Sequence, residues 1–390
     1  MTPPPGAAIA RVLTAKGAVQ DPAWHHALLA VDRDAFVPET VWADCEGDGT
    51  YRPYPRTDPD VQRWMRQDVS LVTQVDDGSV MDAGGRPSSS LSQPSLVVRM
   101  LQELDAADGQ TVLEIGTGSG YNTALLCERL GDANVTSVEV DPGVAWQAAR
   151  ALEALGYKPT LIIGDGAAGA PGATPFDHLI STVAVREIPS AWIEQTRPGG
   201  RIVTPWAPGP GFASSSLLRM VVGANGEAHG RLVGDAAFMV LRDHRPAAVS
   251  ARSLVDEDDP AARTGSTRTN PRWVADRHPG WQVVLGHLVP GLGYASYEAA
   301  EDHASAAGEA TVYVVDRDGS GSWALGEYEP GPGPYETRTR GPRDLWAEVA
   351  AARTVWERAG RPGRDRLGLT VHPDGRQEVW LDTPDQVLAV

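Results

Sequence analysis

The stretch VLEIGTGSGY, residues 112–121, decides the fold of this 390-residue chain. A short apolar segment containing one acid, Glu114, runs into three glycines that alternate with small polar residues, and an amphipathic segment follows. Glycine lets a backbone turn sharply and approach a ligand without a Cβ clash, and open α/β sheets bind ligands at the carboxyl ends of their strands. The dinucleotide fingerprint G-x-G-x-x-G does not fit, because Tyr121 stands at the position of its last glycine.

Around this loop, short apolar strands alternate with amphipathic helices. Strands are predicted at residues 111–115, 135–140, 160–163, 176–182 and 201–205, and helices at residues 94–104, 121–130, 142–155 and 190–196. This alternation is typical of βαβ units that build a mainly parallel sheet. Two further strands, at residues 217–222 and 231–241, are expected to close it. The predicted fold is a doubly wound, Rossmann-like α/β sheet.

The remaining sequence divides the chain into four regions. Residues 1–88 are predicted to form an N-terminal helical segment and a lid-like excursion rich in Asp, Gly and Pro, and residues 89–245 the α/β core. Residues 246–280 are polar and indicate a linker. Residues 281–390 are expected to form a small α+β C-terminal domain, with strands at 281–288, 310–315 and 322–327, a helix at 342–359 and a hairpin at 367–371 and 378–381.

Three acidic residues stand in register with the first three predicted strands. Glu114 precedes the glycine loop, Glu139 ends the second strand, and Asp165 follows the third in a Gly-Asp-Gly turn. One acid after a strand is more often a helix cap than a ligand. All three in this order resemble the S-adenosylmethionine (SAM) motif of class I methyltransferases. Glu139 is then placed for the two ribose hydroxyls and Asp165 for the adenine amino group, and Glu114 is expected to orient the loop.

SAM is therefore the expected cofactor. The residues predicted to bind it are Glu114, Gly116, Thr117, Gly118, Gly120, Tyr121, Glu139, Val140, Asp165 and Gly166. No metal is expected, because the two cysteines, Cys45 and Cys127, lie far apart and match no metal-ligand spacing.

Five short motifs resemble, in their order, the protein-L-isoaspartate O-methyltransferase family. They are AFVP at 35–38, LSQP at 91–94, LEIGTGSGYNT at 113–123, GDG at 164–166 and RPGGRI at 197–202. The resemblance covers roughly residues 10–245 and implies that SAM esterifies an aspartyl-type side chain of a peptide or protein. It also implies that Ser92 is the active-site serine, with Ser90 and Gln93 contacting the substrate. The alternative for Ser92 is a cap on the helix predicted at 94–104.

Several features depart from the typical repair enzyme of this family. Three serines occupy 88–90, where a Gly-Gln-Thr segment is usual, the excursion at 46–88 is longer, and the C-terminal domain is additional. In these respects the chain resembles actinobacterial members that tailor ribosomally made peptides of the lanthipeptide, graspetide or lasso type. That resemblance implies an aspartyl residue of a cyclised peptide, whose ester collapses to a succinimide (aspartimide) or isoaspartate. The alternatives are a general isoaspartate repair enzyme and, from another class, a non-catalytic SAM-binding scaffold.

The charge of the chain argues against some partners. With 34 basic and 51 acidic residues its formal net charge is −17, which repels nucleic acid and anionic lipid, so neither is expected as a partner. Residues 1–6 lack the pattern of a signal peptide, and no apolar run is long enough for a membrane span, so the expected location is the cytoplasm. The sequence leaves the oligomeric state open.

Overall fold

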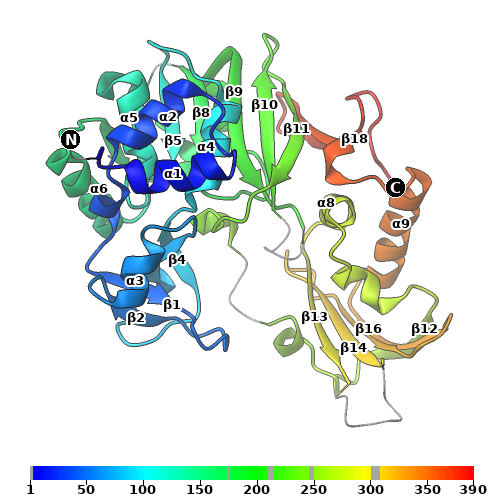
Figure 1. Cartoon of the computed structure of the whole chain (residues 1–390). Coiled ribbons are helices and arrows are strands. Elements are labelled where there is room, and N and C mark those ends of the chain that lie inside the picture. Colours follow the sequence, from blue (N-terminus) through cyan, green and yellow to red (C-terminus); the bar gives the residue numbers. More distant parts are fainter. Residues whose placement is uncertain (1–2, 174, 210–214, 246–249, 300–307) are drawn as a thin grey trace.

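The computed structural model describes residues 3–173, 175–209, 215–245, 250–299 and 308–390. Its centre is a nine-stranded sheet with the order β18-β17-β11-β10-β9-β8-β5-β6-β7 (Figure 1). The strands from β9 to β7 are parallel, and the others continue the sheet in antiparallel pairs. The predicted doubly wound α/β class is confirmed. The core strands are β5 (Val112–Ile115), β6 (Val135–Glu139), β7 (Thr160–Ile163), β8 (Phe176–Ser181), β9 (Thr196–Trp206), β10 (Ser216–Val222) and β11 (Ala228–Asp235).

The helices of the core form close to their predicted positions. They are α4 (Pro94–Leu104), α5 (Tyr121–Leu130), α6 (Pro142–Ala154) and α7 (Ser190–Glu194), and the predicted bounds of α4 and α5 are confirmed to the residue. A proline opens both α4 and α6, where its missing N–H costs no hydrogen bond. Asp141 caps α6, because its carboxylate accepts from the backbone N–H groups of Gly143 and Val144.

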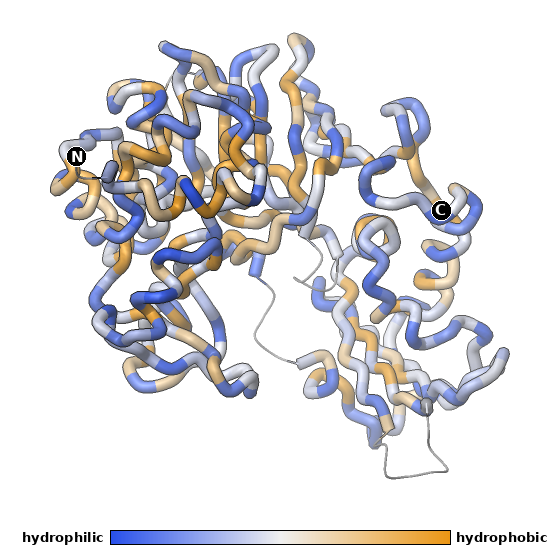
Figure 2. The backbone as a smooth tube through the Cα atoms, in the orientation of Figure 1, coloured by the Kyte–Doolittle hydropathy of each residue, from blue (hydrophilic) through white to orange (hydrophobic). Residues whose placement is uncertain are grey.

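Hydrophobic side chains cover both faces of this sheet. Leu179 and Ile202 belong to a buried cluster that also contains Trp192 of α7, whereas Ile180 and Val203 belong to a second cluster with Leu101 of α4. This alternation follows from the two-residue period of a strand. Figure 2 shows hydrophobic segments running along the strands, with hydrophilic turns at their ends.

The N-terminal region holds more than the predicted helices and excursion. After α1 (Ala7–Ala15) and α2 (Pro22–Ala30), a four-stranded antiparallel sheet forms in the order β2-β1-β3-β4. Its strands are β1 (Thr40–Ala43), β2 (Arg52–Pro55), β3 (Leu71–Val75) and β4 (Pro87–Leu91), with α3 (Pro59–Trp64) between β2 and β3. The excursion is therefore an ordered small sheet. The sequence did not predict this sheet, because the two prolines in β2 and the three serines in β4 are atypical of strands.

The C-terminal region contains one clear correction. The strand predicted at 281–288 is wrong, because Pro279–Leu288 forms helix α8. Residues 280–286 are all buried, so this helix is covered on every side and lacks the exposed polar stripe that distinguishes a helix from a strand. A five-stranded antiparallel sheet and α9 (Leu345–Arg358) complete the region; its strands, in spatial order, are β12 (Arg263–Thr267), β16 (Tyr335–Arg340), β15 (Trp323–Tyr328), β14 (Ala310–Asp316) and β13 (Leu292–Glu298).

The predicted hairpin forms, as β17 (Leu367–Val371) and β18 (Gln377–Leu381), but it belongs to the central sheet. β17 pairs with β11, so the last strands of the chain extend the methyltransferase core. Gly368 allows this, because a Cβ there would lie 2.1 Å from the ring of Trp380, which crosses the strand. The division into residues 1–88, 89–245, 246–280 and 281–390 stays a proposal. β12 lies within the predicted linker but pairs with β16 of the C-terminal region, and β17 of the C-terminal region pairs with β11 of the core. Within the described ranges, every helix is too short or too polar to cross a bilayer.

Candidate active site

The glycine loop joins β5 to α5 in a conformation that only glycine adopts without strain. Gly116, Gly118 and Gly120 have φ values of +89°, +53° and +92°. A Cβ on Gly116 would lie 2.8 Å from Oγ1 of Thr182, so this position also lacks room for a side chain. At Gly116 and Gly118 the loop therefore presents backbone, with no side chain, to the pocket above it.

Glu114 supports this loop from below. It is fully buried, and its carboxylate accepts hydrogen bonds from Asn122 Nδ2 at 2.7 Å, Thr123 Oγ1 at 2.5 Å and Ser137 Oγ at 2.6 Å. Burial raises the pKa of Glu114, and these three donors oppose the rise. Such contacts suit a residue that shapes the loop, and its role toward the cofactor stays a prediction.

Glu139 lies at the carboxyl end of β6, beside the loop. Its carboxylate accepts from the Gly118 N–H at 2.9 Å and from the Asp141 N–H at 3.0 Å, and burial raises its pKa. Asp165, by contrast, is exposed, and its carboxylate accepts from the Ala167 N–H at 2.9 Å. The structure thus brings Glu139 to the loop and gives Asp165 a capping contact, while the ribose and adenine roles remain predictions.

Most of the predicted cofactor residues line one pocket, which is narrow. Its volume is about 80 Å³, because residues 239–242 and 88–90 lie across the glycine loop. Among the predicted residues its lining includes Gly116, Thr117, Gly118, Tyr121, Glu139, Val140 and Gly166, whereas Glu114, Gly120 and Asp165 lie outside it. A backbone cradle that a Cβ would fill, next to a half-buried carboxylate, fits an adenosyl group. This pocket of about 80 Å³ is smaller than ordinary ligand pockets, which measure about 300–1000 Å³. The covering segments must therefore move apart before an adenosyl group can enter.

Ionic contacts hold these covering segments together. Asp77, which follows β3, pairs with Arg242 at 3.0 Å and with Arg245 at 2.7 Å. Arg242 also reaches Asp141 at 3.5 Å, and Gln74 of β3 donates to the same carboxylate at 3.1 Å. The small N-terminal sheet, the segment at 239–245 and the start of α6 are therefore tied to one another over the cofactor pocket.

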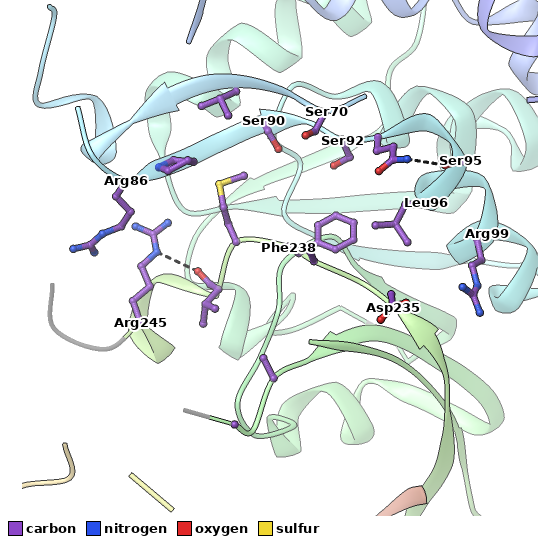
Figure 3. Close-up of a pocket in the computed structure, with 18 of the residues that line it drawn as sticks. Ser70, Arg86, Ser90, Ser92, Ser95, Leu96, Arg99, Asp235, Phe238 and Arg245 are labelled. Carbon is purple, nitrogen blue, oxygen red and sulfur yellow. Dashed lines mark hydrogen bonds between the residues drawn. The ribbon is translucent and has the colours of Figure 1, made fainter. Parts of the chain in front are cut away.

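A much larger cavity adjoins the cofactor pocket. Its volume is about 1550 Å³, and the two cavities share Ser90, Ser92, Met239, Val240 and Arg245. Figure 3 shows Ser90 and Ser92 at its upper wall, with Phe238 facing them from below. The predicted substrate residues Ser90 and Gln93 and the predicted active-site residue Ser92 all line this cavity.

Ser92 is not the cap of α4. The capping position belongs to Gln93, and the first turn is capped from a distance, because Asp68 Oδ1 accepts from the Ser95 N–H at 2.8 Å. The alternative role for Ser92 is therefore wrong. In the described part of the chain the Ser92 hydroxyl has no hydrogen-bond partner, which leaves it available to a ligand where the two cavities meet.

One important residue escaped sequence reasoning. Arg33 is 2% exposed, and its guanidinium donates to the carbonyl oxygens of Met65 at 2.9 Å, Val69 at 2.8 Å and Ser92 at 3.4 Å. Burial lowers its pKa. It fixes the backbone of Ser92 against the N-terminal region. Its place just before the AFVP motif was the only available signal, and a lone arginine is ordinarily a surface residue.

The sheet order, the glycine loop at the end of β5 and the acid at the end of β6 define a class I SAM-dependent methyltransferase. Comparison with known proteins is more specific. The family model described as protein-L-isoaspartate(D-aspartate) O-methyltransferase matches residues 66–245. A protein-L-isoaspartate O-methyltransferase of Anaeromyxobacter dehalogenans is 39% identical over 194 residues, which is 49% of this chain and 88% of that protein. One of Methylorubrum extorquens is 33% identical over 229 residues, 59% of this chain and 84% of that protein.

This chain belongs to the protein-L-isoaspartate O-methyltransferase family, and SAM is its cofactor. A solved structure with the name of that enzyme shares the fold with a TM-score of 0.56 at 21% identity, covering 97% of this chain and all of that one. The likeness in fold therefore reaches into the C-terminal region.

Proposed function

We propose that this enzyme esterifies the side-chain carboxylate of an aspartyl residue in a constrained peptide, such as a cyclised product of ribosomal origin. The main support for this proposal is that Ser90 and Ser92 line both the cofactor pocket and a cavity of about 1550 Å³. Ordinary small-molecule pockets measure about 300–1000 Å³, so this cavity has room for a folded peptide segment. The three serines at 88–90 of β4 support the same proposal, because they stand where the typical repair enzyme has a Gly-Gln-Thr segment.

The chemistry asks little of the protein beyond placement. A side-chain carboxylate has a reference pKa of about 3.9, so it is ionised at neutral pH and needs no general base. When bound, SAM supplies a methyl group on a positively charged sulfur. The carboxylate oxygen forms a bond to this carbon, the carbon–sulfur bond breaks with its electron pair left on sulfur, and the two charges cancel. The chain must hold the oxygen about 3 Å from the methyl carbon, in line, and exclude water.

Ser92 is the residue that we assign to this placement. Its hydroxyl would donate to the carboxylate oxygen that is not attacking, and Arg33 holds its backbone through the Ser92 carbonyl. Once the ester forms, the next backbone nitrogen of the peptide can attack the ester carbonyl. A five-membered succinimide closes and methanol leaves with the amide proton. That step needs no residue of this chain.

The second candidate is a general repair enzyme for isoaspartyl residues. The relatives named protein-L-isoaspartate O-methyltransferase favour it, and so does the shared fold of the C-terminal region. A non-catalytic scaffold fits less well, because the glycine loop, Glu139 and Ser92 are all present and together at the site.

The test is methyl transfer from SAM, followed by mass spectrometry, to three substrates in parallel. These are a linear isoaspartyl peptide, its aspartyl twin, and the cyclised form of that aspartyl peptide. The control is the cyclised peptide with Asn in place of Asp, which has no carboxylate to esterify.

We expect the cyclised aspartyl peptide to gain a methyl group and then to lose methanol, while its Asn control stays unmodified. Modification of the isoaspartyl peptide alone would overturn the proposal and establish the repair function. SAM binding with no transfer to any of the three would favour the scaffold.

A further inference from the structure

The cavity beside Ser92 carries the opposite charge to the protein as a whole. The chain has a formal net charge of −17. The charged residues that line the cavity, however, are five arginines and two carboxylates: Arg86, Arg99, Arg186, Arg245, Arg317, Glu103 and Asp235. An excess of positive charge is therefore concentrated on this one concave surface.

The two carboxylates that line the cavity, Glu103 and Asp235, each form an ion pair with an arginine that lies outside the cavity lining. Glu103 pairs with Arg219 at 2.9 Å, and Asp235 pairs with Arg364. Neither Arg219 nor Arg364 lines the cavity. These two acids therefore do not cancel the charge of the lining arginines.

Three of the lining arginines have no carboxylate partner among the residues that the structure describes. Arg99 donates to the Val233 carbonyl oxygen, a neutral acceptor, and for the guanidinium groups of Arg86 and Arg186 no hydrogen bond or ion pair occurs in the described ranges. All three are half-buried, which strengthens their field relative to that of fully solvated charges. Arg245 shares the single carboxylate of Asp77 with Arg242.

Two lining arginines also lie close enough to repel each other. Burial lowers the pKa of Arg317, and the positive charge of Arg186 lowers it further. Arg186 follows β8 of the core and Arg317 follows β14, so the two come from different sheets. Mutually repelling cations are costly, and such arrangements concentrate at functional sites that bind an opposite charge.

From this lining we infer that the cavity selects an acidic peptide: carboxylates other than the one esterified are bound by Arg86, Arg99 and Arg186. The inference rests on the proposed function and names its substrate class. In the view of Figure 3, Arg86 and Arg245 lie toward one side of the cavity and Arg99 toward the other, with Ser90 and Ser92 between them. A peptide whose acidic residues flank the reacting Asp on both sides matches this order.

The net charge of the chain and the charge of its cavity predict opposite results. Long-range repulsion from −17 would weaken the binding of an acidic peptide, whereas the arginines would strengthen it. Guanidinium groups also bind carboxylates in a planar, two-point geometry.

The experiment measures peptide binding directly, by fluorescence anisotropy in the presence of S-adenosylhomocysteine. The probes are two cyclised decapeptides with one Asp, one flanked by four Glu residues and its twin by four Gln residues. The variants are Arg86→Gln and Arg186→Gln. The control is Arg150→Gln, which removes an equal charge from an exposed position on α6, away from the cavity.

We expect the Glu probe to bind about tenfold more tightly than the Gln probe at low salt, with the difference shrinking at high salt. Each cavity variant should weaken the Glu probe about two- to fivefold and leave the Gln probe unchanged, as single partly exposed pairs do. Arg150→Gln should change neither. Equal binding of the two probes, tighter binding of the Gln probe, or preferential binding of a single-stranded oligonucleotide would overturn the inference. Because binding is measured apart from methyl transfer, absence of transfer would count against the proposed function alone.

Discussion

Arg33 offers the sharpest test of how the N-terminal region supports the active site. We consider Arg33→Met, which keeps much of the side-chain volume and removes every donor. The two short hydrogen bonds, to Met65 at 2.9 Å and to Val69 at 2.8 Å, and the longer one to Ser92 at 3.4 Å would all be lost. The three carbonyl oxygens lie where water reaches poorly, since Arg33 is 2% exposed.

The expected cost follows from these contacts. A buried polar group left without a partner costs about 1–3 kcal/mol. Removing the buried charge returns part of this, because burial disfavours the guanidinium and lowers its pKa. Taking the two short bonds as the main loss, we expect Arg33→Met to lower the free energy of unfolding by about 2–4 kcal/mol. Arg33→Lys should recover part of this, since an ammonium can still donate to one or two of the carbonyls.

The functional consequence separates positioning from stability. Release of the Ser92 carbonyl should shift the Ser92 hydroxyl and lower kcat at least tenfold in Arg33→Met, because small misplacements of positioning groups are costly. Arg56→Met is the matched control. Arg56 also donates to two carbonyl oxygens, of Val37 at 2.9 Å and Asp34 at 2.7 Å, but it is more exposed and does not contact Ser92. It should cost about 1 kcal/mol, the worth of an ordinary hydrogen bond, and leave kcat unchanged.

Urea unfolding gives the stability of each variant, and methyl-transfer kinetics under conditions where both variants are folded give kcat. The assignment of Arg33 as a positioning residue fails if Arg33→Met keeps the wild-type kcat, or if Arg56→Met lowers kcat to the same degree.

Four further predictions concern the site and its supports. Ser92→Ala should leave SAM affinity unchanged in calorimetry and slow methyl transfer about tenfold, the worth of one hydrogen bond to a charged group; unchanged turnover would refute the role of Ser92. Asp165→Ala should weaken SAM binding more than Asp165→Asn, which keeps the cap on Ala167, and equal affinity in all three proteins would discredit the adenine assignment. Asp77→Asn breaks both ion pairs over the cofactor pocket and should speed the release of S-adenosylhomocysteine several-fold in stopped flow, an effect that high salt should mimic in the wild type. The His372 ring donates to the carboxylate of Glu378 and to that of Glu227, and these two hydrogen bonds raise the pKa of His372 above 6.5. The stability that they give the β17–β18 hairpin is therefore complete below pH 6.5 and is lost as the pH rises through the raised pKa, and His372→Gln should remove that part of the decline in melting temperature.

The core of the fold was predictable because its signals are local. The glycine loop at 116–120, the proline that opens α4 and the apolar spacing of α4 and α5 each depend on a few neighbouring residues. The lining of the cofactor pocket follows, because the carboxyl ends of adjacent parallel strands meet at one edge of a sheet.

What the sequence did not predict depends on distant parts of the chain. Residues 280–286 of helix α8 are all buried, so its sequence lacks an exposed polar stripe with helical spacing. Such a mostly apolar run predicts a buried strand as readily as a helix. Pairing of β17 with β11 joins residues more than a hundred positions apart, and no local pattern encodes it. Arg33 is the same kind of case, since its three partners lie 32, 36 and 59 positions away.

The C-terminal region cannot be treated as a detachable recognition module. Leu367 and Leu369 of β17 and Trp281 of α8 belong to the same buried cluster as Leu179 of the core sheet. Removing the region would uncover that cluster and expose β11 as an unpaired edge, which invites aggregation. The same region also contributes Arg317 to the wall of the large cavity. Substrate recognition and the integrity of the core sheet thus depend on the same stretch of chain, so single substitutions at cavity-facing residues, and not truncations, can separate the two.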